Sequence, residues 1–116
     1  MTQPARIAYQ TPEPYDSGMV VEEVARDGTP GAPRWPFQAA RFEVPPGATT
    51  ELDVHDVAEL WMVRAGQGTV RSGDTTLEVG PGEMVYFAGR VPHQVTNTGT
   101  GQLRLFSVWW NGGAPS

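Results

Sequence analysis

Apolar residues recur at every second position over several short stretches, which is the period of a β-strand with one buried face. The clearest stretch is 37–44, where Gln38, Ala40, Phe42 and Val44 share one face. Residues 58–64, 69–72, 75–79, 84–87, 93–97 and 103–110 are predicted to be strands as well. Residues 19–25 are ambiguous, because their valines suit a strand while their spacing also fits one helical face.

Turn-forming residues separate these stretches. In Pro45-Pro46-Gly47, Pro46 presets φ and Gly47 can supply the positive φ of a type II turn. Gly73-Asp74 is typical of a two-residue hairpin loop between neighbouring strands. Short strands joined by glycine and proline turns predict an antiparallel sandwich or barrel.

The stretch 58–64 is apolar on both faces. Glu59, Trp61 and Val63 alternate with Leu60 and Met62. One face is expected to look into the interior, so the other must meet a second sheet, the N-terminal arm or a partner subunit. A homodimer is the natural interpretation.

The chain has 116 residues, which is enough for one domain with a core and too few for two. We expect an extended, proline-rich arm over residues 1–18, a β-barrel domain over 19–111 and a short tail over 112–116. Residues 27–36, with two glycines and three prolines, are expected to form a loop. The beginning of the chain has no charged-then-apolar leader, and no apolar run approaches a membrane span, so we expect a cytoplasmic protein.

Composition narrows the choice of partner. The net charge is −5, with eight arginines and no lysine, so no basic stripe favours nucleic acid or an anionic membrane. We therefore expect a small-molecule substrate. The absence of cysteine excludes disulfides and thiolate ligands.

One segment carries three residues able to ligate a metal ion. Gly47 is followed six residues later by Asp53, then by His55, Glu59 and Gly66. If Asp53 and His55 lie on one strand they point the same way, and Glu59 can join them from the next strand. This is a metal-ligand set without cysteine. The segment resembles the first motif of the cupin superfamily, with Asp53 in place of the usual first histidine.

A second segment, one hairpin downstream, resembles the second cupin motif. Gly82, His93 and Asn97 stand at its glycine, histidine and asparagine positions. Ala88 and Arg90 replace its proline and its second glycine, in a turn that holds no ligand.

The resemblance implies an all-β fold, an antiparallel β-barrel or double-stranded β-helix of the cupin, jelly-roll type. It also favours a strand over a helix for residues 19–25.

The resemblance further implies one divalent metal ion held by His55, Glu59 and His93. His55 and His93 are the only two histidines of the chain, and both fall on ligand positions. The alternative is that they are ordinary surface or packed histidines. Asp53 is either a fourth ligand or a loop carboxylate that serves as general base or as a bystander. Carboxylate ligands favour Fe²⁺ or Mn²⁺, with Zn²⁺ or Ni²⁺ as alternatives.

Three other residues are candidates for the pocket. Trp61 shares a strand face with Glu59 and is expected to line the cavity. Either Tyr86 or Phe87 must face inward; Phe87 suits the core, whereas Tyr86 would offer a catalytic phenol as acid or hydrogen-bond donor. Arg90 would bind an anionic substrate at the cavity mouth, unless it is a solvated loop residue.

These features favour a metal-dependent cupin enzyme that performs dioxygenation, isomerisation, cyclisation or elimination on a small oxygenated substrate. The main alternative is a non-catalytic module that binds or senses a small molecule. A storage-type barrel is a third interpretation, and it would leave the ligand positions without a purpose.

Overall fold

The computed structural model describes residues 4, 6–25 and 36–111. Its strands are β1 Glu13–Pro14, β2 Val20–Glu23, β3 Gln38–Val44, β4 Ala58–Ala65, β5 Gly68–Ser72, β6 Thr75–Val79, β7 Met84–Phe87, β8 His93–Asn97 and β9 Leu103–Trp110. These residues include no helix, and therefore none long and apolar enough to cross a membrane. The all-β prediction is confirmed, including the strand within residues 19–25.

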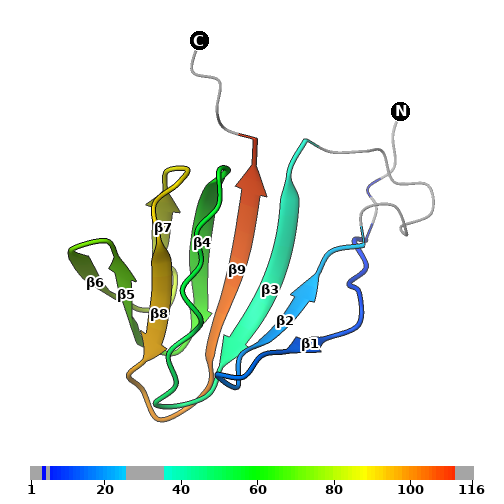
Figure 1. Ribbon diagram of the computed structural model, residues 1–116. Helices are drawn as coiled ribbons and strands as arrows, with labels where there is room; N and C mark the ends of the chain where they lie inside the picture. Colours follow the sequence, from blue (N-terminus) through cyan, green and yellow to red (C-terminus); the bar gives the residue numbers. More distant parts are fainter. Residues whose placement is uncertain (1–3, 5, 26–35, 112–116) are drawn as a thin grey trace.

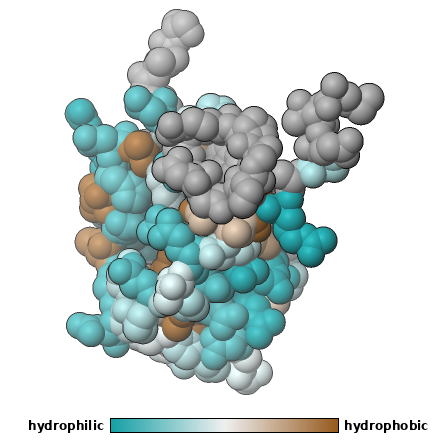
Figure 2. All heavy atoms as spheres, turned by 90° about the vertical axis from the view of Figure 1, so that its right-hand side faces the viewer, coloured by the Kyte–Doolittle hydropathy of each residue, from teal (hydrophilic) through white to brown (hydrophobic). Residues whose placement is uncertain are grey.

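The strands form two antiparallel sheets (Figure 1). The larger sheet has the order β1-β2-β3-β9-β4-β7 and the smaller one β6-β5-β8. Within the described residues, the strand pairing does not close the two sheets into one ring, so the fold is a jelly roll of two facing sheets. The view from the β1–β2 side shows a mostly hydrophilic surface with hydrophobic patches (Figure 2).

The core lies between the sheets. The larger sheet supplies Phe42, Trp61, Val63 and Leu105, among others, while the smaller sheet supplies Val70, Val79 and Val95. The inward face predicted for 37–44 is confirmed, since Ala40, Phe42 and Val44 are all buried.

The predicted turns are also confirmed. Gly47 has a φ of 80° and Gly73 a φ of 59°, conformations that side-chain-bearing residues rarely adopt. Asn97, the asparagine of the second motif, is 1% exposed and braces the turns. Its Nδ2 donates to the carbonyl oxygens of Val44 and Gly101, both at 2.8 Å.

Residues 47–53 run along the free edge of β8. The backbone N–H of Thr50 donates to the Val95 oxygen at 2.9 Å. Asp53 and His93 exchange two backbone hydrogen bonds of 3.0 and 2.9 Å. This pairing places the segment that carries Asp53 directly beside the first residue of β8.

The N-terminal segment joins the larger sheet, because β1 is its edge strand. β1 pairs with β2, and Tyr9 forms an isolated bridge with Val24. The predicted tail 112–116 and all but the last residue of the predicted loop 27–36 lie outside the described residues.

On the outer face of β4, Leu60 and Met62 are half-buried within the single chain, and their cover by a partner subunit stays a prediction. Their neighbours on β7, Met84 and Tyr86, are 57% and 62% exposed.

Candidate metal centre

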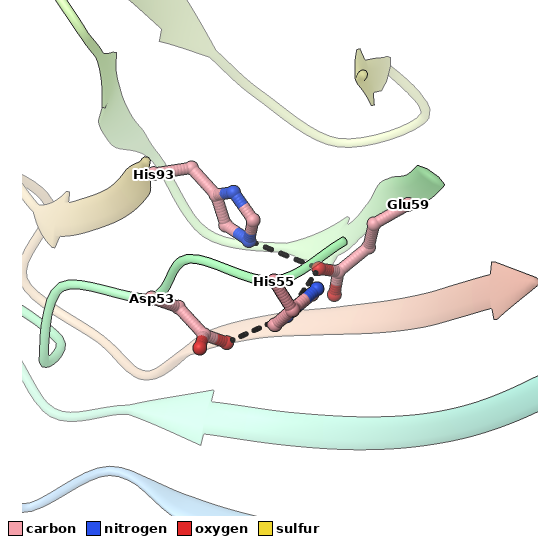
Figure 3. A group of neighbouring side chains, drawn as sticks. All are labelled: Asp53, His55, Glu59 and His93. Carbon is pink, nitrogen blue, oxygen red and sulfur yellow. Dashed lines mark hydrogen bonds and ion pairs between the residues drawn. The ribbon is translucent and has the colours of Figure 1, made fainter. Parts of the chain in front are cut away.

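Asp53, His55, Glu59 and His93 lie close together, with their side chains turned toward one another (Figure 3). Each offers one ligand atom, and these four atoms lie within 4.8 Å of one another. The His93 Nε2 is 2.9 Å and the His55 Nε2 3.4 Å from the Glu59 Oε1, and the His55 Nε2 is 3.2 Å from the Asp53 Oδ2.

Glu59 is held by two residues that leave one of its oxygens free for the histidines. Its Oε2 accepts hydrogen bonds from the Trp61 Nε1, at 2.8 Å, and from the Ser107 hydroxyl. Burial by itself raises the pKa of Glu59, but hydrogen bonds from His93, Ser107 and Trp61 outweigh it and hold the pKa below its usual value. Glu59 is therefore a buried carboxylate with Oε1 directed into the cluster.

His93 is 2% exposed and is fixed on several sides. Its Nδ1 donates to the Val91 carbonyl oxygen at 3.0 Å, which leaves Nε2 directed at Glu59. Its ring stacks on Phe87 with 4.3 Å between centroids. Burial alone would lower the pKa of His93, but its hydrogen bonds to Glu59 and Val91 raise it.

Asp53 and His55 do not lie on a regular strand, which corrects the expectation from their spacing. Asp53 forms an isolated bridge with His93, and His55 lies in the loop that leads to β4. The loop is fixed from the other side, where the Arg90 N–H donates to the His55 oxygen at 2.7 Å. Gly89 permits this approach, because a Cβ there would collide with the Asp56 carbonyl oxygen.

The cluster fits a divalent cation. Two carboxylates and two imidazoles lie in a small volume. A cation bound there would relieve the repulsion between the two carboxylates. The His55 Nδ1 is buried and has no hydrogen-bond partner among the described residues. The Val91 carbonyl and the Ser107 hydroxyl supply the outer hydrogen bonds that orient metal ligands in proteins.

A cavity of about 600 Å³ opens beside the cluster, and all four residues contribute to its wall. As expected, Trp61 lines the cavity. Ser107, Phe42 and Trp109 line it too, although the sequence analysis did not assign them to the site. The sequence does contain a signal for Ser107. It is the polar residue between Leu105 and Trp109 on the strand face that points inward.

Tyr86 and Arg90, two expected pocket residues, do not lie at the cluster. Phe87 faces inward at 3% exposure, so its neighbour Tyr86 faces outward, where its ring lies 6.5 Å from that of Trp110. Arg90 does not line the cavity; its Nε is 3.3 Å from the Asp56 Oδ1, and both side chains are 84% exposed. Arg90 has a φ of 67°, which explains why the cupin motif has glycine at this position.

The fold and the cluster define a small jelly-roll protein with a candidate site for a divalent metal. Residues 40–109 match the cupin domain family, and the chain belongs to this family. A xanthan biosynthesis protein, XanB from Xanthomonas campestris pv. campestris (strain B100), is 37% identical over 73 residues. That match covers 62% of this chain and 16% of XanB, so the chain spans about one-sixth of the curated relatives it matches.

Solved structures show the same fold. A Cupin 2 conserved barrel domain protein from Salinispora arenicola CNS-205 superposes with a TM-score of 0.73 at 22% identity, covering 89% of this chain and 90% of that one. A predicted oxalate decarboxylase from Thermotoga maritima superposes with a TM-score of 0.69 at 19% identity, covering 94% and 99%.

Proposed function

We propose that the chain is a metal-dependent cupin enzyme acting on a small oxygenated molecule. The observation that carries the proposal is the convergence of Asp53, His55, Glu59 and His93 at the wall of a cavity of about 600 Å³. A cavity of this size suits a small organic molecule.

The residues of the cluster would have different roles in holding the metal ion. Glu59 and His93 are buried and braced, so they would form the fixed part of the site, and His55 would complete it from the loop. When bound, a divalent ion would polarise a substrate oxygen or, if it is iron, support reaction with dioxygen. The two carboxylates favour Fe²⁺ or Mn²⁺ over Zn²⁺ and Ni²⁺.

In this proposal Asp53 would accept or donate a proton during the reaction. Its side chain is 58% exposed and lies at the cavity wall, with Oδ2 3.2 Å from the His55 Nε2. A carboxylate there can accept a proton from a substrate carbon or hydroxyl. Isomerisation, cyclisation and elimination need such a transfer, and dioxygenation is the iron-dependent alternative. Trp61 and Phe42 give the cavity an apolar wall.

The test is elemental analysis of protein purified without chelator, followed by a mass-spectrometric screen of oxygenated substrates. We expect about one divalent ion per chain, turnover that disappears on chelation, and recovery when metal is restored. The melting temperature should fall on chelation, because an ion that binds only the folded state stabilises it by mass action. Full turnover without metal would refute the proposal. Metal-dependent binding without any turnover would favour the non-catalytic binding module.

We also propose that the chain forms a homodimer through the outer face of β4, β7 and β9. In the strand register, Leu60 lies between Tyr86 and Val108, and Met62 between Met84 and Phe106. A contiguous apolar face of this kind is typical of an interaction surface. Light scattering should give twice the chain mass at micromolar concentration, and Tyr86→Glu should give the monomer. Leu77→Glu, at an exposed position of β6, is the matched control, and a monomeric wild type would count against the dimer.

A further inference from the structure

The cavity beside the cluster has an unbalanced charge. Four carboxylates line it, those of Glu23, Glu51, Asp53 and Glu59. The chain has no lysine, and none of the arginines in the described part of the chain, Arg6, Arg41, Arg64, Arg71, Arg90 and Arg104, is among the lining residues. If a divalent ion neutralises Asp53 and Glu59, the other two carboxylates still leave the described wall negative.

Arg41 is the arginine nearest to Glu23 in the strand register, and its side chain points away from the cavity. Arg41 follows Ala40 on β3, so its side chain lies on the opposite face of the sheet. Its Nε is 2.9 Å from the Glu22 Oε1, and its guanidinium lies 3.7 Å above the ring of Tyr9. The larger sheet therefore keeps its positive charge outside and presents carboxylates to the cavity.

Glu23 lines the cavity from β2, two strands away from Ser107 on β9. The strand register places Glu23, Ala40, Ser107 and Trp61 side by side across four neighbouring strands. Directly paired residues point to the same face of a sheet, so Glu23 faces the same interior as Ser107, which binds Glu59. Two strand spacings separate Glu23 from Ser107, which is roughly 10 Å. Between them lies Ala40, which also lines the cavity.

The two remaining carboxylates differ in availability. Both oxygens of Glu51 are occupied, since they accept hydrogen bonds from the N–H and the hydroxyl of Ser17 at 2.9 and 2.6 Å. Glu23 is exposed, and its carboxylate has no hydrogen bond or ion pair among the described residues. Glu23 is thus the carboxylate that a ligand can use.

The pKa of Tyr15, which lines the cavity, is affected by the same negative charges. Its pKa is raised by partial burial, then by its hydrogen bond to Glu13 and by the charges of Glu13, Glu23 and Asp53. Both Glu23 and Asp53 therefore act on one phenol that also lines the cavity. Together with Phe42, Trp61 and Trp109, this phenol gives the wall an aromatic character suited to a cation or a ring.

We propose that the cavity selects an organic amine, whose oxygen donors lie toward the Asp53–His55–Glu59–His93 cluster and whose ammonium group pairs with Glu23. The inference rests on the proposed function, because the cluster must hold a metal to receive the oxygen donors. It assigns Glu23 as the residue that determines charge specificity, and it disfavours dianionic substrates such as oxalate.

The test uses three probes with the same metal-binding head and different charges: dopamine, neutral methylcatechol and anionic dihydroxyphenylacetate. Zinc-loaded protein is titrated with each by calorimetry, because zinc does not oxidise the catechol. We expect dopamine to bind on the order of tenfold more tightly than dihydroxyphenylacetate, with methylcatechol between them. The preference should shrink at high salt, since Glu23 is exposed.

Glu23→Gln should reduce the affinity for dopamine toward that for methylcatechol. It should leave methylcatechol binding unchanged, which also shows that the variant is folded. Glu22→Gln, on the opposite face of β2, is the matched control and should keep the preference. Equal or tighter binding of dihydroxyphenylacetate, or an unchanged ratio in Glu23→Gln, would overturn this inference alone. If zinc loading promotes binding of none of the three probes, the metal-dependent function fails together with it.

Discussion

Replacing His93 with alanine is expected to weaken metal binding strongly and to destabilise the metal-free protein. A change in the outer hydrogen bonds of a metal site typically costs 10- to 100-fold in affinity, so we expect loss of a ligand to cost about 100-fold or more. The metal-free protein should lose about 3–5 kcal/mol, because His93→Ala removes one partner of a buried pair and leaves the Glu59 Oε1 with only the His55 Nε2, 3.4 Å away. Elemental analysis and urea unfolding with and without metal measure the two effects.

Two companion variants separate ligation from packing. His93→Gln keeps much of the volume and can still donate to Glu59, so it should lose metal with a smaller loss of stability. His55→Ala should also lose metal but cost little stability in the metal-free protein, since the His55 side chain is 33% exposed. Full metal content in either alanine variant would show that the histidine concerned is not a ligand.

The strands could be predicted because local signals agreed with the final packing. Gly47 and Gly73 mark turns that need positive φ, and the alternation in β3 places Ala40, Phe42 and Val44 in the core. The resemblance to the two cupin motifs also pointed to the four residues that the structure brings together.

Other features depend on contacts that no spacing encodes. Tyr86 and Phe87 are both aromatic, so the choice between them required the pairing of β7 with β4, which places Phe87 beside Glu59. The bond from Ser107 to Glu59 joins strands far apart in sequence. The conformation of the Asp53 segment depends on the edge of β8, because Asp53 bonds through its backbone to His93 rather than through a regular ladder.

Glu23 shows the same limit in a different way. In the sequence it is one of two adjacent glutamates, and nothing local distinguishes Glu22 from Glu23. The strand register decides that Glu22 pairs with Arg41 outside while Glu23 faces the cavity. A functional difference between neighbouring identical residues thus arises only when β2 joins the larger sheet.

Asp53 is the position at which this chain departs from the usual cupin ligand set, and its substitution gives the second large expected effect. Asp53→Ala should weaken metal binding by roughly tenfold, less than His93→Ala, because three other ligand residues remain. The fold should survive, since Asp53 is tied to His93 through backbone hydrogen bonds of 3.0 and 2.9 Å that alanine retains. Metal affinity and turnover are measured on the same preparations.

Asp53→His would restore an imidazole at this position and should tighten metal binding. A carboxylate ligand lowers the net charge of the site, which weakens the ion as a Lewis acid and stabilises a higher oxidation state. The histidine variant should therefore shift the reactivity of the site as well as its affinity. If Asp53→Ala keeps its metal affinity but loses turnover, Asp53 is the general base and not a ligand. If neither quantity changes, Asp53 is a bystander, and His55, Glu59 and His93 form the site alone.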